Sequence, residues 1–457
     1  MRALPRRLAI AALALAALSA QATDLMQAWQ AAREHDPDAA IALAGRQAGE
    51  TRRAQAAALW RPTLALNATV GAMNADTAMT GARFSAPGFG QSDGVNFATS
   101  IHGGTSTRWG LSARQPLVSG DRQAQRRQLL IGADAADLEW QASQQELMLR
   151  TAQRYFDAVL AERKLELLQR QQLAVDQALV EARDRFAAGD KPITDTHEAS
   201  ARARALQAQV LAAESELQLA REQLSDVTGL PPAALQLAPP AEAAAPAVLP
   251  PLEQWLELAG RDSPQLRLQQ ANAQSAAQEV ARRSARAGVT LDLVAEAGRD
   301  RLAGSGDFGS ASNTASQAMV GLQLTVPLST GGMRSARQDE ALRLQEKADA
   351  EVERTRQQVR QQTRAAWLGL QTGKARLQAL AESLTASRAR LDATQLGRQV
   401  GDRTTLDLLN AQNDASGAEL ALVQARADVL LNRLRLAALA GGLDEARLQE
   451  VNAALQR

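Results

Sequence analysis

Apolar and polar residues alternate with period two in four short segments of the chain. In the first segment Leu64, Leu66 and Val70 share one face, and in the last Leu322 and Leu324 do the same. Nine or ten residues with one apolar and one polar face are typical of a strand that spans an outer membrane. We therefore predict four transmembrane β-strands. They lie at 62–71, 108–117, 289–298 and 318–328.

Charged residues lie on the polar faces of these segments, namely Arg108, Arg114, Asp292 and Glu296. Such charges suit a water-filled lumen. Residues 72–107 and 299–318 are rich in Gly, Ser, Asn, Asp and Thr, and we predict that they are solvated outer loops. The alternative is a soluble β-domain that packs one face on a core, but the rest of the chain offers no other β-strand pattern to cover that face.

Long stretches without proline predict helices of unusual length. Residues 121–188 and 333–400 contain no proline, and each would extend roughly 100 Å as one α-helix. Because proline inside a helix costs about 3 kcal/mol, its positions indicate where helices end. Residues 193–228 and 404–440 are predicted to form the helices that follow, each ending at a glycine stop signal.

Landmark residues recur in the same order in two halves of the chain. Pro37 recurs as Pro264, at a shift of 227 positions. Gly189-Asp190 recurs as Gly401-Asp402, at a shift of 212 positions. The spacing is far longer than that of a solenoid repeat, so we predict a duplicated half. The predicted parts are a first repeat at 23–238, a linker at 239–251, a second repeat at 252–443 and a C-terminal tail at 444–457.

Residues 1–22 have the pattern of a secretory signal peptide. Three arginines precede an apolar run from Leu8 to Leu18, and Ala20-Gln21-Ala22 forms a small-x-small cleavage site. The alternative is an N-terminal anchor, but a spanning helix needs roughly 20 apolar residues. The mature chain is therefore expected outside the cytoplasm.

The composition excludes several classes of protein. Lys and Arg total 51 against 50 Asp and Glu, and this balance argues against a nucleic-acid binder. The chain has no cysteine and three histidines spread along its length. No metalloprotease, serine-hydrolase or phosphate-loop motif is present. We therefore expect no enzyme activity, cofactor or metal site.

Four strands cannot close a barrel. An unpaired strand edge in lipid leaves several backbone groups unsatisfied, each at a cost of several kcal/mol. The total would exceed the roughly 5–15 kcal/mol by which proteins are typically stable. If the strands span a membrane, the chain must therefore oligomerise, and three copies are the smallest set that encloses a channel.

Three local motifs resemble those of the TolC family of outer-membrane efflux and type I secretion channels. The first is Leu25-Met26-Gln27-Ala28-Trp29, which leads to Asp36-Pro37. The second is the pair of strand exits that end at Gly120 and Gly332. The third is the turn from Gly397 to Ala411. The resemblance extends over nearly all of the mature chain.

The resemblance implies a mainly α-helical fold with a β-barrel part. In it, duplicated long-helix hairpins form an α-barrel, and each subunit of a homotrimer gives four strands to a 12-stranded barrel. It also implies a passive duct in the outer membrane with a long periplasmic extension. The implied partners are outer-membrane lipid, a periplasmic adaptor and an inner-membrane transporter of the ABC, RND or MFS type. The residues select neither a cargo nor one of these transporters.

In that family, the turn between the long helix and the next helix closes the periplasmic tip. Pairs of polar residues spaced i,i+3 beside each turn would become rings in a trimer, and rings of carboxylates select cations. The alternative is that the acids cap helix N-termini. The residues that the resemblance places at the gate are Arg398, Arg403, Asp407 and Asn410, with Asp195 and Glu198 at the equivalent places in the first half.

A second class of protein also fits the long helices and the signal peptide. A periplasmic coiled-coil adaptor or scaffold would share both features. It would not need two strand pairs in duplicated positions, so we favour the channel.

Overall fold

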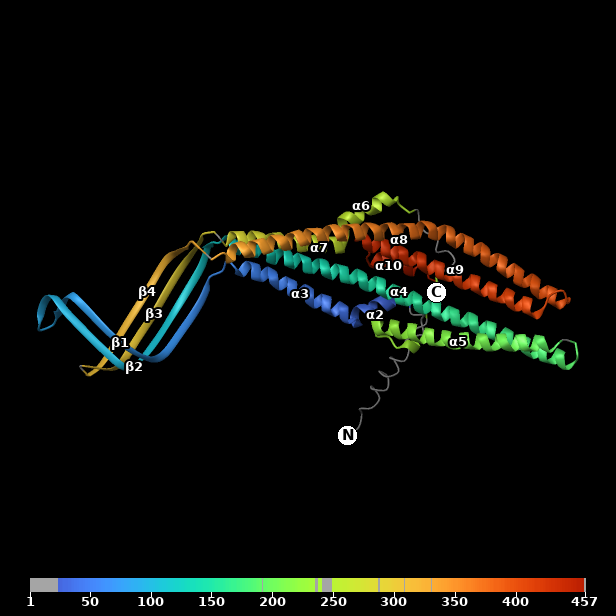
Figure 1. Ribbon diagram of the computed structural model, residues 1–457, viewed down its shortest axis with the longest axis horizontal. Helices are drawn as coiled ribbons and strands as arrows, with labels where there is room; N and C mark the ends of the chain where they lie inside the picture. The colour runs from blue at the N-terminus through green and yellow to red at the C-terminus, as the bar shows by residue number, and fades with distance from the viewer. Residues whose placement is uncertain are drawn as a thin grey trace, which may run out of the picture. The chain divides into compact units, whose positions relative to one another are not determined.

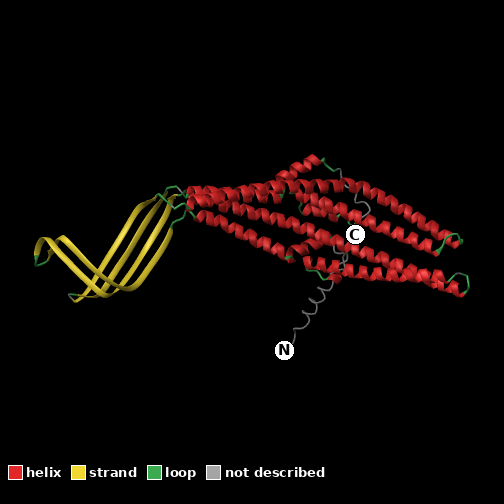
Figure 2. Ribbon diagram, viewed as in Figure 1, coloured by secondary structure: helices red, strands yellow, loops and turns green. Residues whose placement is uncertain are grey.

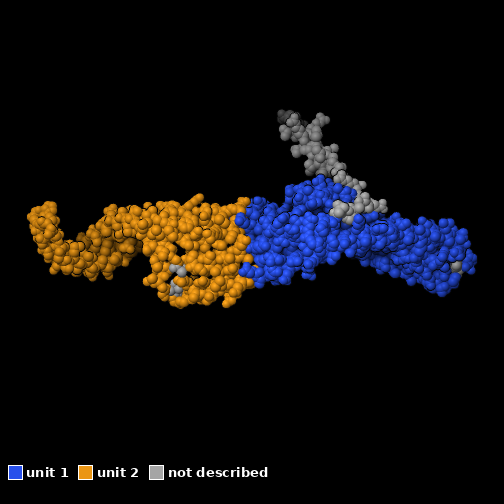
Figure 3. Space-filling view, turned by 90° about the horizontal axis from the view of Figure 1, so that it is seen from above, with its two compact units in different colours: residues 1–49, 134–271, 349–457 blue, residues 50–133, 272–348 orange. Residues whose placement is uncertain are grey.

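The structure is a computed structural model that describes residues 24–190, 192–234, 237–240, 249–286, 288–307, 309–329 and 331–455. The predicted signal peptide and residues 241–248 of the predicted linker lie outside this part of the chain. The chain forms two compact units (Figure 3). One comprises residues 1–49, 134–271 and 349–457, and the other comprises residues 50–133 and 272–348. Each unit draws on both predicted halves of the sequence.

Helices make up most of the described chain (Figure 2). The two long predicted helices are present as α4, with 68 residues, and α8, with 67 residues. The predicted tail is not without structure, because it contains α10, which Asp444 caps by accepting a hydrogen bond from the Arg447 N–H. None of the described helices is both long and apolar enough to cross a membrane. The helices are α2 (Leu25–His35), α3 (Pro37–Ala58), α4 (Gly120–Ala187), α5 (Ile193–Thr228), η1 (Pro232–Ala234), α6 (Leu252–Asp262), α7 (Pro264–Ala285), α8 (Met333–Gln399), α9 (Thr405–Leu439) and α10 (Glu445–Asn452).

Four antiparallel strands form one sheet in the order β1-β2-β3-β4 (Figure 1). At the ends next to the helices, the strands begin and end near the predicted residues. At their other ends they extend much further than predicted. Most of the residues assigned to outer loops, 72–107 and 299–318, belong to the strands. The prediction failed there because a hairpin satisfies backbone hydrogen bonds whatever its side chains, so polar residues do not end a strand. The strands are β1 (Thr63–Ala86), β2 (Gly90–Val118), β3 (Thr290–Gly306) and β4 (Gly309–Thr325).

The strand register brings the apolar faces of all four strands together. Leu66 pairs with Leu111, Leu111 with Ala297, and Ala297 with Ala318. Most large side chains on this face are exposed in the single chain; Leu66, for example, is 70% exposed. The opposite face is polar, and there Arg108 contacts Asp300 at 2.6 Å. The sheet therefore has a continuous apolar surface and a charged surface.

The sheet is open, because β1 and β4 pair with a strand on one side only. Each therefore presents a row of backbone groups along its outer edge. In the part of the chain that the structure describes, no further strand covers either edge.

Two helix junctions are built alike in the two halves of the sequence. α5 ends at Gly229, which has φ +71° and lies against the ring of His35. α9 is followed by Gly441, which has φ +70° and lies against the backbone of Asp262. His35 and Asp262 are related by the predicted shift of 227 positions. This shared contact supports the predicted duplication.

Ion pairs also recur within the two helical hairpins. Lys164 of α4 binds Glu216 of α5 at 2.6 Å, and Arg376 of α8 lies 3.6 Å from Asp428 of α9. The shift of 212 positions relates Lys164 to Arg376, and it also relates Glu216 to Asp428.

The largest buried cluster holds the two ends of the described chain together. Trp29, Tyr155 and Phe156 are buried in it, together with Leu448 of α10. Burial raises the pKa of Tyr155 to about 12, so its hydroxyl remains protonated and hydrogen-bonds the backbone of Ala238. The Asn452 side chain accepts a hydrogen bond from the Leu25 N–H and donates one to Asp24. Thus α10 fixes the start of α2.

Candidate channel gate at the helical turns

The two hairpin turns have the same backbone design. α4 ends before Gly189, with φ +76°, and α8 ends before Gly401, with φ +86°. The Asp190 N–H donates to the Arg185 carbonyl, and the Asp402 N–H donates to the Gly397 carbonyl. A positive φ favours glycine, since a Cβ atom strains this conformation. Gly189 and Gly401, which the shift of 212 positions relates, therefore occupy equivalent positions in the two turns.

A capping box starts α9 and includes Asp407. The Thr404 hydroxyl accepts a hydrogen bond from the Asp407 N–H at 3.1 Å, while the Asp407 carboxylate accepts from the Thr404 N–H at 3.0 Å and from its hydroxyl at 2.8 Å. These bonds to Thr404, with nearby Arg403 and Arg390, lower the pKa of Asp407. Asp407 is thus a capping residue, as the alternative interpretation expected. The Asp407 carboxylate still carries its negative charge at the turn.

The start of α5 is different. Pro192 precedes this helix and makes no side-chain capping bond, and Asp195 lies in the first turn. Both Asp195 and Glu198 are exposed. The Thr196 hydroxyl instead binds back to the Ala182 carbonyl of α4 at 3.3 Å. The two carboxylates therefore project from the turn without serving as the cap.

Arg398 links the two hairpins. Its guanidinium forms an ion pair with Glu181 of α4, and about 30% of each side chain is exposed (28% and 31%). Glu181 also binds Arg185 of its own helix at 2.9 Å. Sequence reasoning named Arg398 but missed Glu181, because only the Glu181–Arg185 spacing of i,i+4 is visible along the chain.

The other predicted gate residues are less closely connected. The Arg403 side chain passes over Gly397, where an added Cβ would lie 2.7 Å from the Arg403 Cγ, and its Nε is 4.0 Å from Asp402. Asn410 is half-buried. Its neighbour Leu409 belongs, with Val175, to a buried cluster that joins α9 to α4 and α5. The six predicted residues therefore form two separate groups, one at each turn, rather than one cluster.

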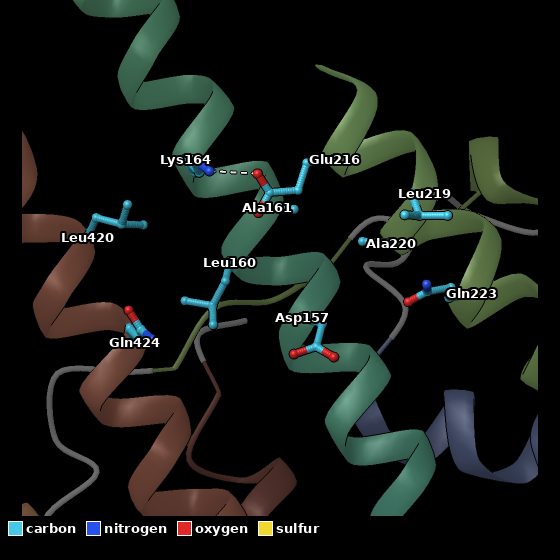
Figure 4. Close-up of a pocket in the computed structure, with 10 residues that line it drawn as sticks. All are labelled: Asp157, Leu160, Ala161, Lys164, Glu216, Leu219, Ala220, Gln223, Leu420 and Gln424. Atoms are coloured by element: carbon cyan, nitrogen blue, oxygen red, sulfur yellow. Dashed lines mark hydrogen bonds and ion pairs between the residues drawn. The ribbon is translucent and has the colours of Figure 1, made fainter. Parts of the chain in front are cut away.

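Further along the hairpins, Glu419 forms a second bridge between them. It lies 3.5 Å from Arg170 of α4 and 3.3 Å from Arg388 of α8. Beyond it, a groove of about 440 Å³ runs between α4, α5 and α9 (Figure 4). The Lys164–Glu216 pair crosses this groove, and Leu420 and Gln424 approach from α9. Ion pairs thus join the hairpins near the turns, and a groove lies between the helices further along.

In the described residues, no group of three or more His, Asp or Glu side chains is placed to hold a metal ion. The charged contacts are ion pairs between helices, which can set how closely two hairpins lie.

The chain combines paired long helical hairpins with an open sheet that is apolar on one face. These features define a helical channel protein with a membrane β-domain. A profile described as outer membrane efflux protein matches residues 28–230 and 255–442. The chain belongs to this family. The predicted family, the mainly α-helical fold with a four-stranded sheet and the outer-membrane channel function are confirmed, and the coiled-coil adaptor is not supported.

Individual relatives match over nearly their full length. The proteases secretion protein PrtF of Dickeya chrysanthemi is 29% identical over 97% of this chain and 94% of that protein. The outer membrane protein TolC of Escherichia coli K12 is 28% identical over 96% of this chain and 86% of that protein. The crystal structure of VceC from Vibrio cholerae covers 92% of this chain and 96% of that one, with a TM-score of 0.70 and 19% identity. This structural match shows the shared fold.

Proposed function

We propose that three copies of this chain form one exit duct through the outer membrane. Their twelve strands would close a barrel, and their hairpins would line a tunnel in the periplasm. The observation that carries the proposal is the open sheet, with unpaired edges at β1 and β4 and one exposed apolar face. In lipid these edges would be too costly to leave unpaired, whereas sister subunits can pair them.

Disulfide crosslinking tests this assembly, and the chain has no cysteine that would interfere. We expect Leu66→Cys on β1, combined in turn with cysteine at Ala318, Val320 or Leu322 on β4, to give a covalent trimer after oxidation in membranes. Within one subunit the two strands are separated by β2 and β3, roughly 14 Å at the usual strand spacing. That distance is too long for a disulfide.

The readout is a non-reducing gel, and each single cysteine variant is the control. At least one β1–β4 pair should shift to the mass of a trimer. Dimer bands alone, or no crosslink for any pair, would contradict a closed ring of three.

We also propose that a periplasmic adaptor and an inner-membrane transporter of the ABC, RND or MFS type dock on the duct. The hairpin turns carry exposed apolar side chains, which include Phe186, Ile193, Val400 and Leu406. Such side chains beside charged residues are a common composition of a protein interface. The name of the PrtF relative refers to protease secretion, which supports a secretion role, while the family description refers to efflux.

The turns are the proposed gate of this duct. Threefold symmetry would place the carboxylates of Asp407 and Asp195 in rings around the axis, where multivalent cations could bind and block the pore. The ion pair between Arg398 and Glu181 would hold the two hairpins of each subunit in the closed arrangement.

Replacing Asp407 with asparagine is expected to weaken cation block. Asparagine keeps an acceptor for the Thr404 N–H but removes the charge, so the cap is largely retained. Because the pKa of Asp407 is lowered, block of the wild-type channel should persist as the pH falls through the usual carboxyl range near about 4. Single-channel recordings with a trivalent cation measure both effects. Unchanged block in D407N would remove this residue from the gate.

A further inference from the structure

Two arginines lie on the apolar face of the sheet. Strand β3 pairs with β4 without a register shift, so Arg299 and Arg301 share the face of Ala297. Arg299 pairs with Trp109 of β2, and Arg301 pairs with Thr107. Directly paired residues of antiparallel strands point to the same face. Both arginines are exposed, so their guanidinium groups project from the side of the sheet that is otherwise apolar.

The arginines lie where the apolar face becomes polar. The row of paired residues that precedes them on the helix side is apolar and consists of Leu111, Ala297 and Ala318. The next two rows carry an aromatic ring, the two guanidinium groups and three hydroxyl groups; they are Trp109–Arg299–Ser316 and Thr107–Arg301–Thr314. The helices of this outer-membrane channel are periplasmic, so these rows lie toward the outer surface. Aromatic and polar residues mark the membrane boundary of such sheets.

Neither arginine is neutralised on its own face. Among the residues that the structure describes, Arg299 and Arg301 form no ion pair. Glu296 and Asp300 are close to them in sequence but lie on the opposite face, where Asp300 binds Arg108 at 2.6 Å. The arginine of the polar face therefore has a carboxylate partner, whereas the two of the apolar face have none among the described residues.

The acidic residues toward the hairpin ends are distant. Asp76 of β1 is six residues beyond Val70, which shares the row of Arg301. Asp307 lies six residues beyond Arg301, and it faces His102 at 3.6 Å. Six residues of a strand span roughly 20 Å, which is about twice the screening length in physiological salt. This part of the face therefore carries two positive charges of its own.

A phosphate group matches these features. A guanidinium group binds phosphate through paired N–H donors, and the two arginines lie about 7 Å apart along β3. The hydroxyl groups of Thr107 and Thr314 flank Arg301 and can also donate. Because the adjoining row is apolar and faces the lipid chains, the anion that meets the arginines there is a headgroup.

We propose that Arg299 and Arg301 bind the phosphate of an outer-leaflet lipid, whose acyl chains lie against the apolar rows of the same sheet. Trp109 would lie beside the headgroup at the membrane boundary. The site is formed by β2, β3 and β4 of one chain, so it requires neither three copies nor the proposed gate. Its failure would leave the crosslinking test of the trimer unaffected.

Native mass spectrometry of the full-length protein, released from maltoside micelles, tests the proposal. The probes are lipid A with its phosphates and the same lipid after enzymatic removal of the phosphates. We expect the phosphorylated lipid to bind at least tenfold more tightly. Equal binding of the two lipids would overturn the proposal. Displacement of lipid A by an equal concentration of inorganic phosphate would show a site for free phosphate, and it would overturn the assignment to a lipid.

Three variants locate the lipid. Arg299→Gln/Arg301→Gln should weaken lipid A binding at least tenfold, whereas Arg299→Lys/Arg301→Lys keeps the charge and should retain most of it. Arg108→Gln removes a positive charge from the opposite face and should change the affinity less than twofold. Unchanged binding in R299Q/R301Q, or an equal loss in R108Q, would contradict the site. If R299Q/R301Q does not assemble, the single variant R301Q is compared with R108Q, and equal affinities would contradict the site.

Discussion

Replacing Arg398 with alanine is expected to open the closed channel. The substitution removes the ion pair between α8 and Glu181 of α4. A pair of this exposure contributes about 1 kcal/mol. A proposed trimer would lose three such pairs, about 3 kcal/mol, which would raise the ratio of open to closed channels roughly a hundredfold. Recordings in planar bilayers should therefore show a larger mean conductance and more frequent open events.

Arg185 provides a matched control for this experiment. It contacts the same Glu181 carboxylate but belongs to the same helix, so its bond does not connect the hairpins. Arg185→Ala should leave the conductance near that of the wild type. Charge reversal, with Arg398→Glu and Glu181→Arg together, should restore closure in part. A silent R398A variant, or equal opening in R185A, would show that this ion pair does not hold the gate.

Replacing Arg150 with methionine is expected to destabilise the helical unit more than removal of any exposed ion pair. Asp36 would remain buried with its charge uncompensated, although two backbone N–H groups still bind it. Loss of one partner of a buried pair typically costs about 3 kcal/mol or more. Methionine keeps most of the aliphatic packing, so the loss reports mainly on charge.

Urea denaturation followed by helical circular dichroism, in one detergent for all variants, measures this change in the free energy of unfolding. Lys164→Met is the control, because Lys164 and Glu216 are 40% and 51% exposed and such pairs contribute less than about 1 kcal/mol. The double variant Arg150→Met/Asp36→Asn should regain part of the loss. Equal losses in R150M and K164M would mean that burial does not strengthen the ion pair between Arg150 and Asp36.

The predicted gate shows where sequence reasoning reached its limit. The pattern Thr404-x-x-Asp407 is a capping-box signature that can be found along the chain, and the structure contains that box. The partner of Arg398 could not be found in this way, because Glu181 is 217 positions distant in sequence. Contacts between hairpins depend on how the helices pack, and the spacing of neighbouring residues along the chain does not indicate that packing.

The sequence by itself determined the order and type of the elements. Proline positions fixed the long helices, since proline ends a helix, and period-two alternation fixed the two faces of each strand. The tertiary structure alone decided how far the strands extend, how the four apolar faces align, and that α10 fixes the start of α2. It also decided that Arg150 of α4 pairs with the buried Asp36 at the start of α3. Pairing, register and packing depend on residues distant in sequence, so their outcome cannot be read from local pattern.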